Sequence, residues 1–172
     1  MYALIYSAGH GTTSNQIAMG ILGFLTSPEQ VALLQADPGL VGNAVEEMLR
    51  FHTVAHMNSV RVALSDVKIG GQLIRAGETV FAMDASANRD PEVFPEPDRF
   101  DIRRDPRQQH LAFSYGVHQC LGQPLTRLEL RAVFERLFQR LPRLRLAVPL
   151  EQIEFLPGSQ VYGIRALPVA WS

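Results

Sequence analysis

The sequence contains one cysteine, Cys120, and one lysine, Lys68, among its 172 residues. A lone cysteine excludes an intramolecular disulfide and any zinc site built from several cysteines. Cys120 therefore either packs as a small apolar residue or acts chemically by itself. The other basic residues are arginines, and the net charge of −1 provides no overall field that would attract nucleic acid. We therefore expect no nucleic-acid partner.

Long hydrophobic runs are also missing. The first six residues are apolar, but polar residues interrupt the run from Ser7 onward, so it falls short of the roughly 18 apolar residues of a membrane span. The basic leader that is typical of a secretory signal peptide is absent as well. We therefore expect a cytoplasmic protein with no membrane contact. Because the apolar start resembles the middle of a buried helix, we also expect the chain to be a fragment.

The composition, with 47% apolar and 19% charged residues, is typical of a soluble globular protein with one core. Apolar residues at helical spacing, together with the Ser27-Pro28 start signal, predict helices over about residues 2–26, 28–37, 40–51 and 121–140. Alternation of period two predicts strands over about residues 59–64, 67–71, 79–83, 144–148, 154–156 and 161–169. Residues 88–105 predict an irregular, packed loop. The predicted fold class is mainly α with small β-sheets.

In the last helix, the apolar residues that we expect to face inward are Leu125, Leu128, Val133, Leu137 and Phe138.

The segment from Phe113 to Gly122 reads Phe-Ser-Tyr-Gly-Val-His-Gln-Cys-Leu-Gly. A thiolate that binds a metal needs its sulfur held at one point, with backbone N–H groups turned toward it. Gly116 and Gly122 allow a tight turn and a close approach of the backbone to a flat ligand. The helix predicted just after Cys120 has a positive N-terminal end, which stabilises a thiolate. A buried structural cysteine is the alternative, but the joint spacing of Phe, Gly, Cys and Gly favours a ligand.

This segment resembles the haem loop of the cytochrome P450 family. Three further segments resemble that family in the order that it has them. They are Ala8-Gly-His-Gly-Thr-Thr13, similar to the oxygen-binding kink of the long central helix, Glu47-Met-Leu-Arg50, similar to the Glu-x-x-Arg helix, and Phe94-Pro-Glu-Pro-Asp-Arg-Phe100, similar to the meander. The resemblance covers residues 1–172 and implies a partial cytochrome P450 fold. It would run from the second half of the central helix through the haem loop to the C-terminus, with the N-terminal half absent.

The resemblance implies haem b (iron protoporphyrin IX) as the cofactor and Cys120 as the only protein ligand to its iron. The residues implied to contact the cofactor are Ala8, Gly9, Arg61, Phe113, Gly116, His118, Cys120 and Gly122. Arg61 and His118 are implied to bind the propionates, because arginine pairs with carboxylates through two hydrogen bonds and histidine can donate one more. From the residues alone, Arg61 is equally consistent with a solvent-facing strand position.

Glu47 and Arg50 lie three residues apart, on one face of a predicted helix, where a surface ion pair is the ordinary interpretation. The resemblance implies instead a buried, structural triad of Glu47, Arg50 and Arg99 beneath the haem loop. Breaking such a buried triad would cost about 3–5 kcal/mol.

The kink segment departs from the family. There a carboxylate normally precedes the threonine, and the two groups relay protons during oxygen activation. Here Gly11 stands where the acid would be, and Thr12 remains. The Thr12 hydroxyl can hydrogen-bond a water, but it cannot replace a carboxylate as a proton reservoir. The resemblance implies a catalytic role for Thr12, and the alternative is a weak point of the helix without a role.

The implied activity is insertion of one oxygen atom from O2 into a small apolar organic substrate, with electrons from a ferredoxin-type partner. A basic docking patch for that partner would contain Arg103, Arg104, Arg107, Arg127 and Arg131. A solvated, arginine-rich surface is the alternative.

Three other functions stay open. The first is a truncated, non-enzymatic chain that binds haem weakly or not at all and forms oligomers through the apolar surface left by the missing half. The second is a peroxide-driven haem protein, suggested by the missing acid. The third is a cysteine hydrolase, which is weakly supported because no His–Asx pair stands out to orient a nucleophile.

Overall fold

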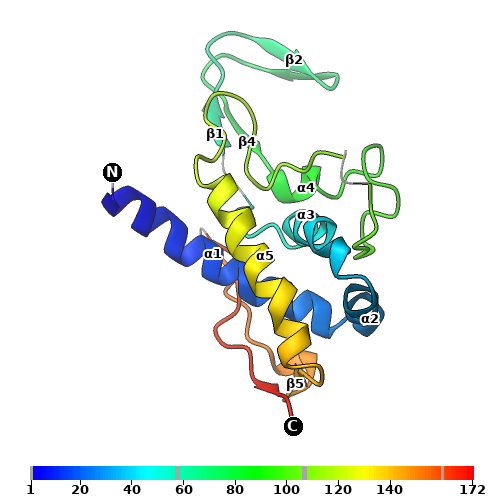
Figure 1. Cartoon of the computed structure of the whole chain (residues 1–172). Coiled ribbons are helices and arrows are strands. Elements are labelled where there is room, and N and C mark those ends of the chain that lie inside the picture. The colour runs from blue at the N-terminus through cyan, green and yellow to red at the C-terminus, as the bar shows by residue number, and fades with distance from the viewer. Residues whose placement is uncertain (1, 57–58, 106–107, 160) are drawn as a thin grey trace.

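The computed structural model describes residues 2–56, 59–105, 108–159 and 161–172 (Figure 1). The helices are α1 (Tyr2–Leu25), α2 (Pro28–Ala36), α3 (Val41–Phe51), α4 (Asp84–Ala87) and α5 (Gln123–Arg140), with 3-10 turns η1 (Pro38–Leu40) and η2 (Leu150–Gln152). The strands are β1 (Ser59–Val62), β2 (Val67–Ile69), β3 (Gln72–Ile74), β4 (Thr79–Ala82), β5 (Arg145–Leu146) and β6 (Val169–Ala170). The predicted class, mainly α with small β-sheets, is confirmed.

The helix boundaries follow the local chemistry of the chain. Pro28 occupies the first turn of α2, where its missing N–H removes no helical hydrogen bond. Ser27 precedes it as predicted, but its hydroxyl makes no capping hydrogen bond. Between α2 and α3, the Asp37 carboxylate accepts from the backbone N–H of Gly39 at 2.9 Å and starts η1. α1 continues through Gly11, although glycine weakens a helix.

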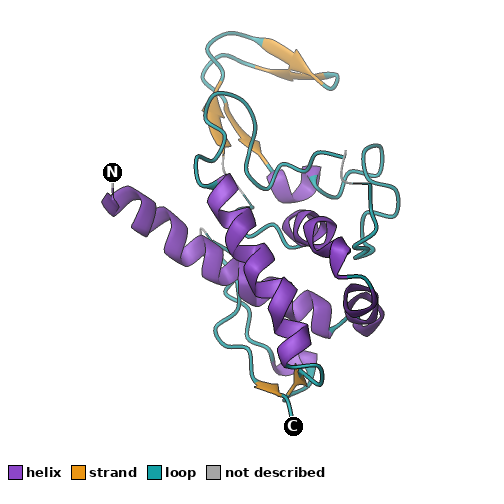
Figure 2. Ribbon diagram, in the orientation of Figure 1, coloured by secondary structure: helices purple, strands orange, loops and turns teal. Residues whose placement is uncertain are grey.

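The strands form three antiparallel two-stranded sheets, which pair β1 with β4, β2 with β3 and β5 with β6. The turn between β2 and β3 contains Gly70 and Gly71 at φ of +55° and +84°, a conformation that favours glycine. Figure 2 shows this hairpin projecting away from the helices. Phe155 and Ile164 form only an isolated bridge where two strands were predicted.

The main core lies where α1, α3 and α5 pack together. Phe24 of α1 is fully buried, and its ring centre lies 5.2 Å from that of Phe100 and 5.4 Å from that of Phe134. Val45 and Met48 of α3 are also fully buried and form part of the apolar face of this helix. This packing fixes α1 and α5 against α3, the helix that carries Glu46 and Glu47.

The buried face of α5 agrees with the predicted one only in part. Leu130, Phe134 and Phe138 are buried, at a spacing of four residues that forms one stripe. Leu125 and Leu128 were expected to face inward but are 50% and 65% exposed. They lie five and two residues before Leu130, which places both on the far side of a helix with about 3.6 residues per turn. Phe138 is buried and Val133 and Leu137 pack against the core, so these three predictions are confirmed, whereas the predictions for Leu125 and Leu128 are wrong.

In the described part of the chain, no single helix is long and apolar enough to cross a membrane. Residues Tyr6–Leu25 of α1 and the helix α2 are long and apolar enough only when they are taken together, and the two helices are bent by 98° relative to each other.

Gly20 and Gly11 offer a matched test of the packing of α1. A Cβ at Gly20 would overlap the buried Met48 side chain and lie 2.8 Å from Phe134, whereas a Cβ at Gly11 would meet nothing within 4 Å. Gly20→Ala should lower the free energy of unfolding by about 1–3 kcal/mol through overpacking. Gly11→Ala should raise it by about 0.5–1 kcal/mol by strengthening the helix. Urea unfolding measures both changes, and equal effects of the two variants would contradict this packing.

Candidate functional site

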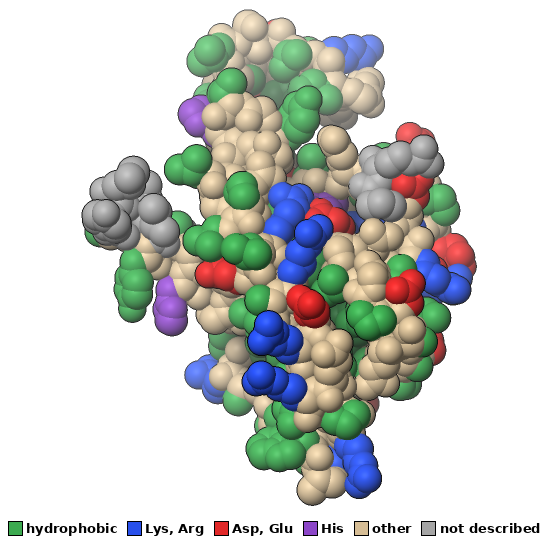
Figure 3. All heavy atoms as spheres, in the orientation of Figure 1, with side chains coloured by type: hydrophobic (Ala, Val, Ile, Leu, Met, Phe, Trp, Pro, Cys, Tyr) green, Lys and Arg blue, Asp and Glu red, His purple; other side chains and the backbone are tan. Residues whose placement is uncertain are grey.

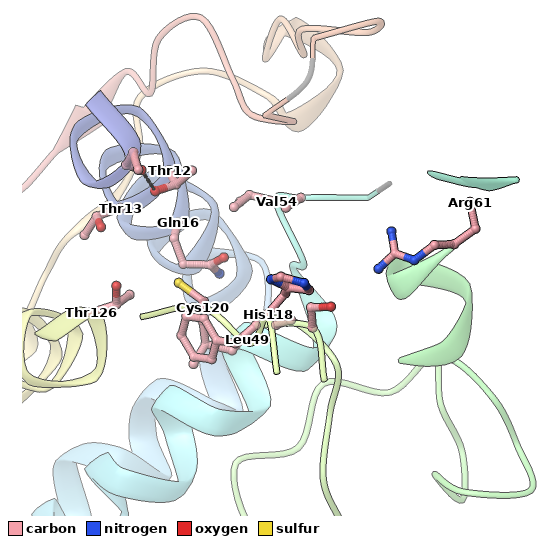
Figure 4. A pocket seen from close by; sticks show the side chains of 14 residues that line it. Thr12, Thr13, Gln16, Leu49, Val54, Arg61, His118, Cys120 and Thr126 are labelled. Carbon is pink, nitrogen blue, oxygen red and sulfur yellow. Dashed lines mark hydrogen bonds between the residues drawn. The ribbon is translucent and has the colours of Figure 1, made fainter. Parts of the chain in front are cut away.

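A cavity of about 620 Å³ lies between α1, the segment that follows α3 and the loop that leads into α5 (Figure 4). This loop, residues 113–122, is the cysteine loop. Six of the nine predicted site residues line the cavity, and they are Ala8, Thr12, Arg61, Phe113, His118 and Cys120. Gly9, Gly116 and Gly122 are not among the lining residues. Residues far apart in the sequence are thus brought around one space.

The backbone of the cysteine loop folds back on itself. The N–H of Cys120 donates to the carbonyl oxygen of Phe113 at 3.0 Å, which closes the loop. Inside it, the N–H of Gln119 donates to the carbonyl of Gly116 at 3.0 Å. Gly116 has φ +88°, in the left-handed region that glycine adopts without steric cost. The glycine predicted to allow a tight turn therefore does so here.

The thiol of Cys120 is exposed and lines the cavity. This contradicts the alternative in which the cysteine packs as a small buried residue. A Cβ on Gly122 would lie 3.8 Å from the Cys120 sulfur, which is an ordinary van der Waals contact. Gly122 therefore lies next to the thiol, but no steric clash requires a glycine at this position. Gly122 is also the N-cap residue of α5, so the positive end of that helix begins just after the cysteine.

Thr12 of α1 also lines the cavity. Its hydroxyl donates to the carbonyl oxygen of Ala8 at 2.6 Å, one turn back along the helix (Figure 4). Ser14 does the same with the carbonyl of His10 at 2.7 Å. Such side-chain bonds compete with the helical ladder and often bend a helix. The segment predicted as a weak centre thus places a hydroxyl in the cavity wall while the helix persists.

Arg61 and His118 are the basic residues that line the cavity in the described part of the chain. Arg61 comes from β1, and its Nη1 donates to the carbonyl of Val60 at 3.1 Å. His118 comes from the cysteine loop. Figure 4 shows the Arg61 guanidinium extending toward the side on which His118 lies. The structure therefore brings together the two groups that were predicted to bind carboxylates, and it places Arg61 toward the cavity.

A buried ion cluster of Glu47, Arg50 and Arg104 connects α3 to the irregular segment of residues 88–105. The Glu47 carboxylate accepts two hydrogen bonds from Arg50, both at 2.8 Å, and one from Nε of Arg104 at 3.1 Å. The Glu47 side chain is 2% exposed and that of Arg50 is 1% exposed. The pair is therefore buried as predicted, and the surface interpretation is wrong.

The prediction that Arg99 is the third member of that cluster is wrong. Its side chain is 51% exposed and pairs with Glu96 at 3.3 Å. Its backbone carbonyl, rather than its guanidinium, faces the cluster and accepts from Arg50 at 3.2 Å and from Arg104 at 3.1 Å. Arg104 supplies the second guanidinium because the chain turns back toward Glu47 only after Arg99.

Two buried polar residues near the site, Gln16 and Asn88, were not predicted from the sequence. Gln16 of α1 lines the cavity, is 3% exposed, and donates from Nε2 to the carbonyl of His52 at 3.0 Å. Asn88 is fully buried, and its side chain bonds both Thr53 at 2.7 Å and the backbone N–H of Leu111 at 2.6 Å. Gln16 ends the polar stretch of residues 12–16, so no local pattern distinguishes it from its neighbours.

His52, at the end of α3, is held uncharged. Burial, together with the nearby charges of Arg89 and Arg50, lowers its pKa from 6.5 to about 4. Its Nε2 atom is buried and makes no hydrogen bond with any described residue. A neutral imidazole at neutral pH is consistent with this apolar position between Phe51 and Phe100.

Arg104 and Arg99 provide a test of the buried cluster. Arg104→Ala should lower the free energy of unfolding by about 2–3 kcal/mol, because the buried Glu47 loses a charged donor. Arg99→Ala should change it by less than about 0.5 kcal/mol, since its ion pair is solvent-exposed. Urea unfolding of both variants measures the difference. Equal losses, or a larger loss for Arg99→Ala, would restore Arg99 to the cluster.

Comparisons with known proteins agree with this architecture. A family model described as Cytochrome P450 matches residues 39–156. Cytochrome P450-SU2 of Streptomyces griseolus is 53% identical over 171 residues, which are 99% of this chain and 42% of that relative. Vitamin D3 dihydroxylase of the same organism is 48% identical over 168 residues, which are 98% of this chain and 41% of that relative.

A solved structure shows the same fold. Cytochrome P450 MoxA from Nonomuraea recticatena superposes with a TM-score of 0.93 at 50% sequence identity, and the match covers 98% of this chain and 42% of that one. The chain thus spans 41–42% of the length of the relatives it matches here. The sequence and the fold together show that the chain belongs to the cytochrome P450 family.

Proposed function

We propose that residues 1–172 are the C-terminal, haem-binding portion of a bacterial haem-thiolate monooxygenase. The observation that carries this proposal is the position of Cys120, whose exposed thiol shares the wall of a cavity with Thr12. The proposed activity is that of the whole enzyme, because the chain spans 42% of the length of Cytochrome P450-SU2.

The residues around the cavity fit a haem b. An accessible thiol at the positive end of α5 suits an iron ligand, because that end stabilises a thiolate. Arg61 and His118 suit the two propionate carboxylates. Leu49 and Val54 give the cavity apolar walls, and its volume of about 620 Å³ falls in the range of about 300–1,000 Å³ of small-molecule sites.

When bound, a cysteine-ligated haem supplies oxygen activation, because the thiolate donates electron density to the iron and favours cleavage of the O–O bond. The residues of this chain would position that chemistry. Cys120 would hold the iron. The Thr12 hydroxyl donates to the Ala8 carbonyl, so its lone pairs can accept a hydrogen bond from a water in the cavity. Gly11 offers no carboxylate beside it, so a proton would have to come from water, from substrate or from another residue.

A small apolar organic substrate is the proposed class. Similar structures include a CYP105P1 complex with filipin I, at 51% identity, and a CYP105P2 complex with a biphenyl compound, at 49% identity. The apolar share of the cavity wall in this chain, which includes Leu49, Val54 and Phe113, agrees with such a substrate.

A ferredoxin-type electron donor remains part of the proposal, but the predicted docking patch needs correction. Figure 3 shows basic side chains gathered over α5 next to acidic ones. Arg104 and Arg127 bind glutamates and are 11% and 30% exposed, so they are poorly placed for docking. Arg107 lies outside the described residues. Arg103 and Arg131 remain as exposed candidates.

The alternative of a non-enzymatic chain that associates through apolar surface has support of its own. Leu64 is 97% exposed, and Val62 and Phe81 of the β1–β4 sheet are 56% and 53% exposed. Large exposed apolar side chains promote association. Haem binding by the isolated chain decides between the two functions.

Cys120 carries the decisive prediction. Haem added to the purified chain, then reduced and exposed to CO, should give the red-shifted Soret band of a thiolate-ligated haem. Cys120→Ala should abolish that band. His118→Ala should weaken haem binding, but the haem that still binds should show the thiolate band. Circular dichroism of each apo variant verifies the fold. If Cys120→Ala keeps the thiolate band, the assignment of the ligand is wrong.

Gly11 gives a separate prediction about the peroxide-driven alternative. Positioned acid catalysis is worth about 10²–10⁴ in rate. An enzyme without the carboxylate should therefore spend part of its reductant on forming hydrogen peroxide instead of product. Added hydrogen peroxide should support turnover. Gly11→Glu should raise the product formed per reductant consumed. The measurement uses the chain joined to the N-terminal portion that the longer relatives have. High coupling in the parent, unchanged by Gly11→Glu, would show that another donor supplies the proton.

A further inference from the structure

A second ion cluster joins α3 to α5 on the side of α3 that faces the cysteine loop. Glu46 binds Arg127 through two hydrogen bonds, from Nε at 2.7 Å and from Nη2 at 3.0 Å. The remaining nitrogen, Nη1, donates to Gln123 at 2.8 Å, at the first residue of α5. A two-point pair of this kind fixes orientation as well as distance. It therefore sets how the start of α5 sits against α3.

His110 connects this pair to the chain just before the cysteine loop. Its Nε2 lies 3.1 Å from the Glu46 carboxylate, and its Nδ1 faces the backbone N–H of Ala112 at 3.2 Å. Because a backbone N–H can only donate, Nδ1 must accept, and the ring proton of a neutral imidazole is then on Nε2, where it is donated to Glu46. The His110 side chain is 5% exposed. One imidazole thus holds both a carboxylate and a backbone group of the loop entrance.

Arg127 also touches the cysteine loop directly. Its guanidinium lies 4.8 Å from the ring centre of Phe113, within the range of a cation–π contact. Phe113 is the residue whose carbonyl oxygen accepts from the N–H of Cys120. The contacts therefore run from Glu46 through Arg127 and Phe113 to the backbone of Cys120, without any of these side chains binding the thiol itself.

The Glu46 carboxylate stays ionised at neutral pH. Burial raises its pKa, but hydrogen bonds from His110 and Arg127, together with the charge of Arg127, outweigh burial and lower the pKa to about 2. A lowered folded-state pKa contributes stability above the ordinary value of 4.5, and this stability is lost as the pH falls from there toward about 2. The space beside the cluster amounts to about 10 Å³, which is about one water, so it is not a ligand site.

We propose that Glu46, His110 and Arg127 are positioning residues that hold the cysteine loop in the conformation that presents Cys120 to the cavity. The carboxylate neutralises and orients Arg127 against Phe113, and His110 fixes the Ala112 amide. Their action on a bound haem rests on the proposed function, whereas their action on the loop does not.

The test compares conservative variants that keep the fold. Glu46→Gln removes the charge but keeps an acceptor. His110→Asn keeps an acceptor for the Ala112 N–H but loses the bond to Glu46, and His110→Gln places a donor near the Nε2 position. Glu154→Gln is the matched control, because Glu154 pairs with Arg165 at 2.9 Å where both side chains are more than 60% exposed.

Hydrogen exchange of the haem-free chain is measured over peptides from residues 108–122 and 128–140. Glu46→Gln and His110→Asn should lower protection in residues 108–122 at least tenfold and leave residues 128–140 unchanged. His110→Gln should restore part of that protection, and Glu154→Gln should change neither peptide. Unchanged protection in residues 108–122, or an equal loss in both peptides, overturns the proposal, because the cluster would then be irrelevant or merely stabilise the whole fold.

Haem-loaded protein provides the second readout. Glu46→Gln and His110→Asn should convert part of the thiolate Soret signature to that of a neutral thiol and speed haem loss several-fold, while Glu154→Gln should match the parent. Full retention of the thiolate signature in both variants overturns the link to Cys120. If the parent itself binds no haem, the proposed function fails, and the exchange measurement still decides whether the cluster holds the loop.

Discussion

The structure depends on the buried pair of Glu47 and Arg50. All five N–H donors of Arg50 are used: two bind Glu47, and three bind the backbone carbonyls of Asn88, Pro97 and Arg99. A charge taken out of water is tolerated only when its partner and its hydrogen bonds are complete. The pair therefore ties α3 to the irregular segment of residues 88–105, which has no helix or strand of its own to satisfy its carbonyls.

Two adjacent glutamates of α3 bind two different parts of the structure. Glu47 binds Arg50 and Arg104 and holds the irregular segment, whereas Glu46 binds Arg127 and His110 and faces α5 and the cysteine loop. Neighbouring side chains of a helix point about 100° apart, so consecutive residues of one helix can contact two different segments. The apolar face of α3, with Val45 and Met48 fully buried, anchors both contacts in the core.

Local patterns predicted the four longer helices, the strands β1, β2, β4 and β5, and the cysteine loop, because residue spacing and glycine positions are local features of the sequence. The short helix α4 and the strand β3 were missed. Local patterns were insufficient where a role depends on how the chain turns. Arg99 and Arg104 are both near Glu47 in space, but Arg99 contributes its carbonyl and Arg104 its guanidinium. His110 likewise stands in no local pattern, because its partner Glu46 lies 64 residues away. Fine placement of charged side chains depends on tertiary packing that no local pattern encodes.

The central claim is that the thiol of Cys120 is the protein ligand of a haem iron. X-ray absorption at the iron edge of the haem-loaded chain tests it most directly, because it identifies the atoms around the metal without relying on activity. The account predicts one sulfur neighbour of iron that is lost in Cys120→Ala. A haem-loaded parent whose iron has only nitrogen and oxygen neighbours would contradict it.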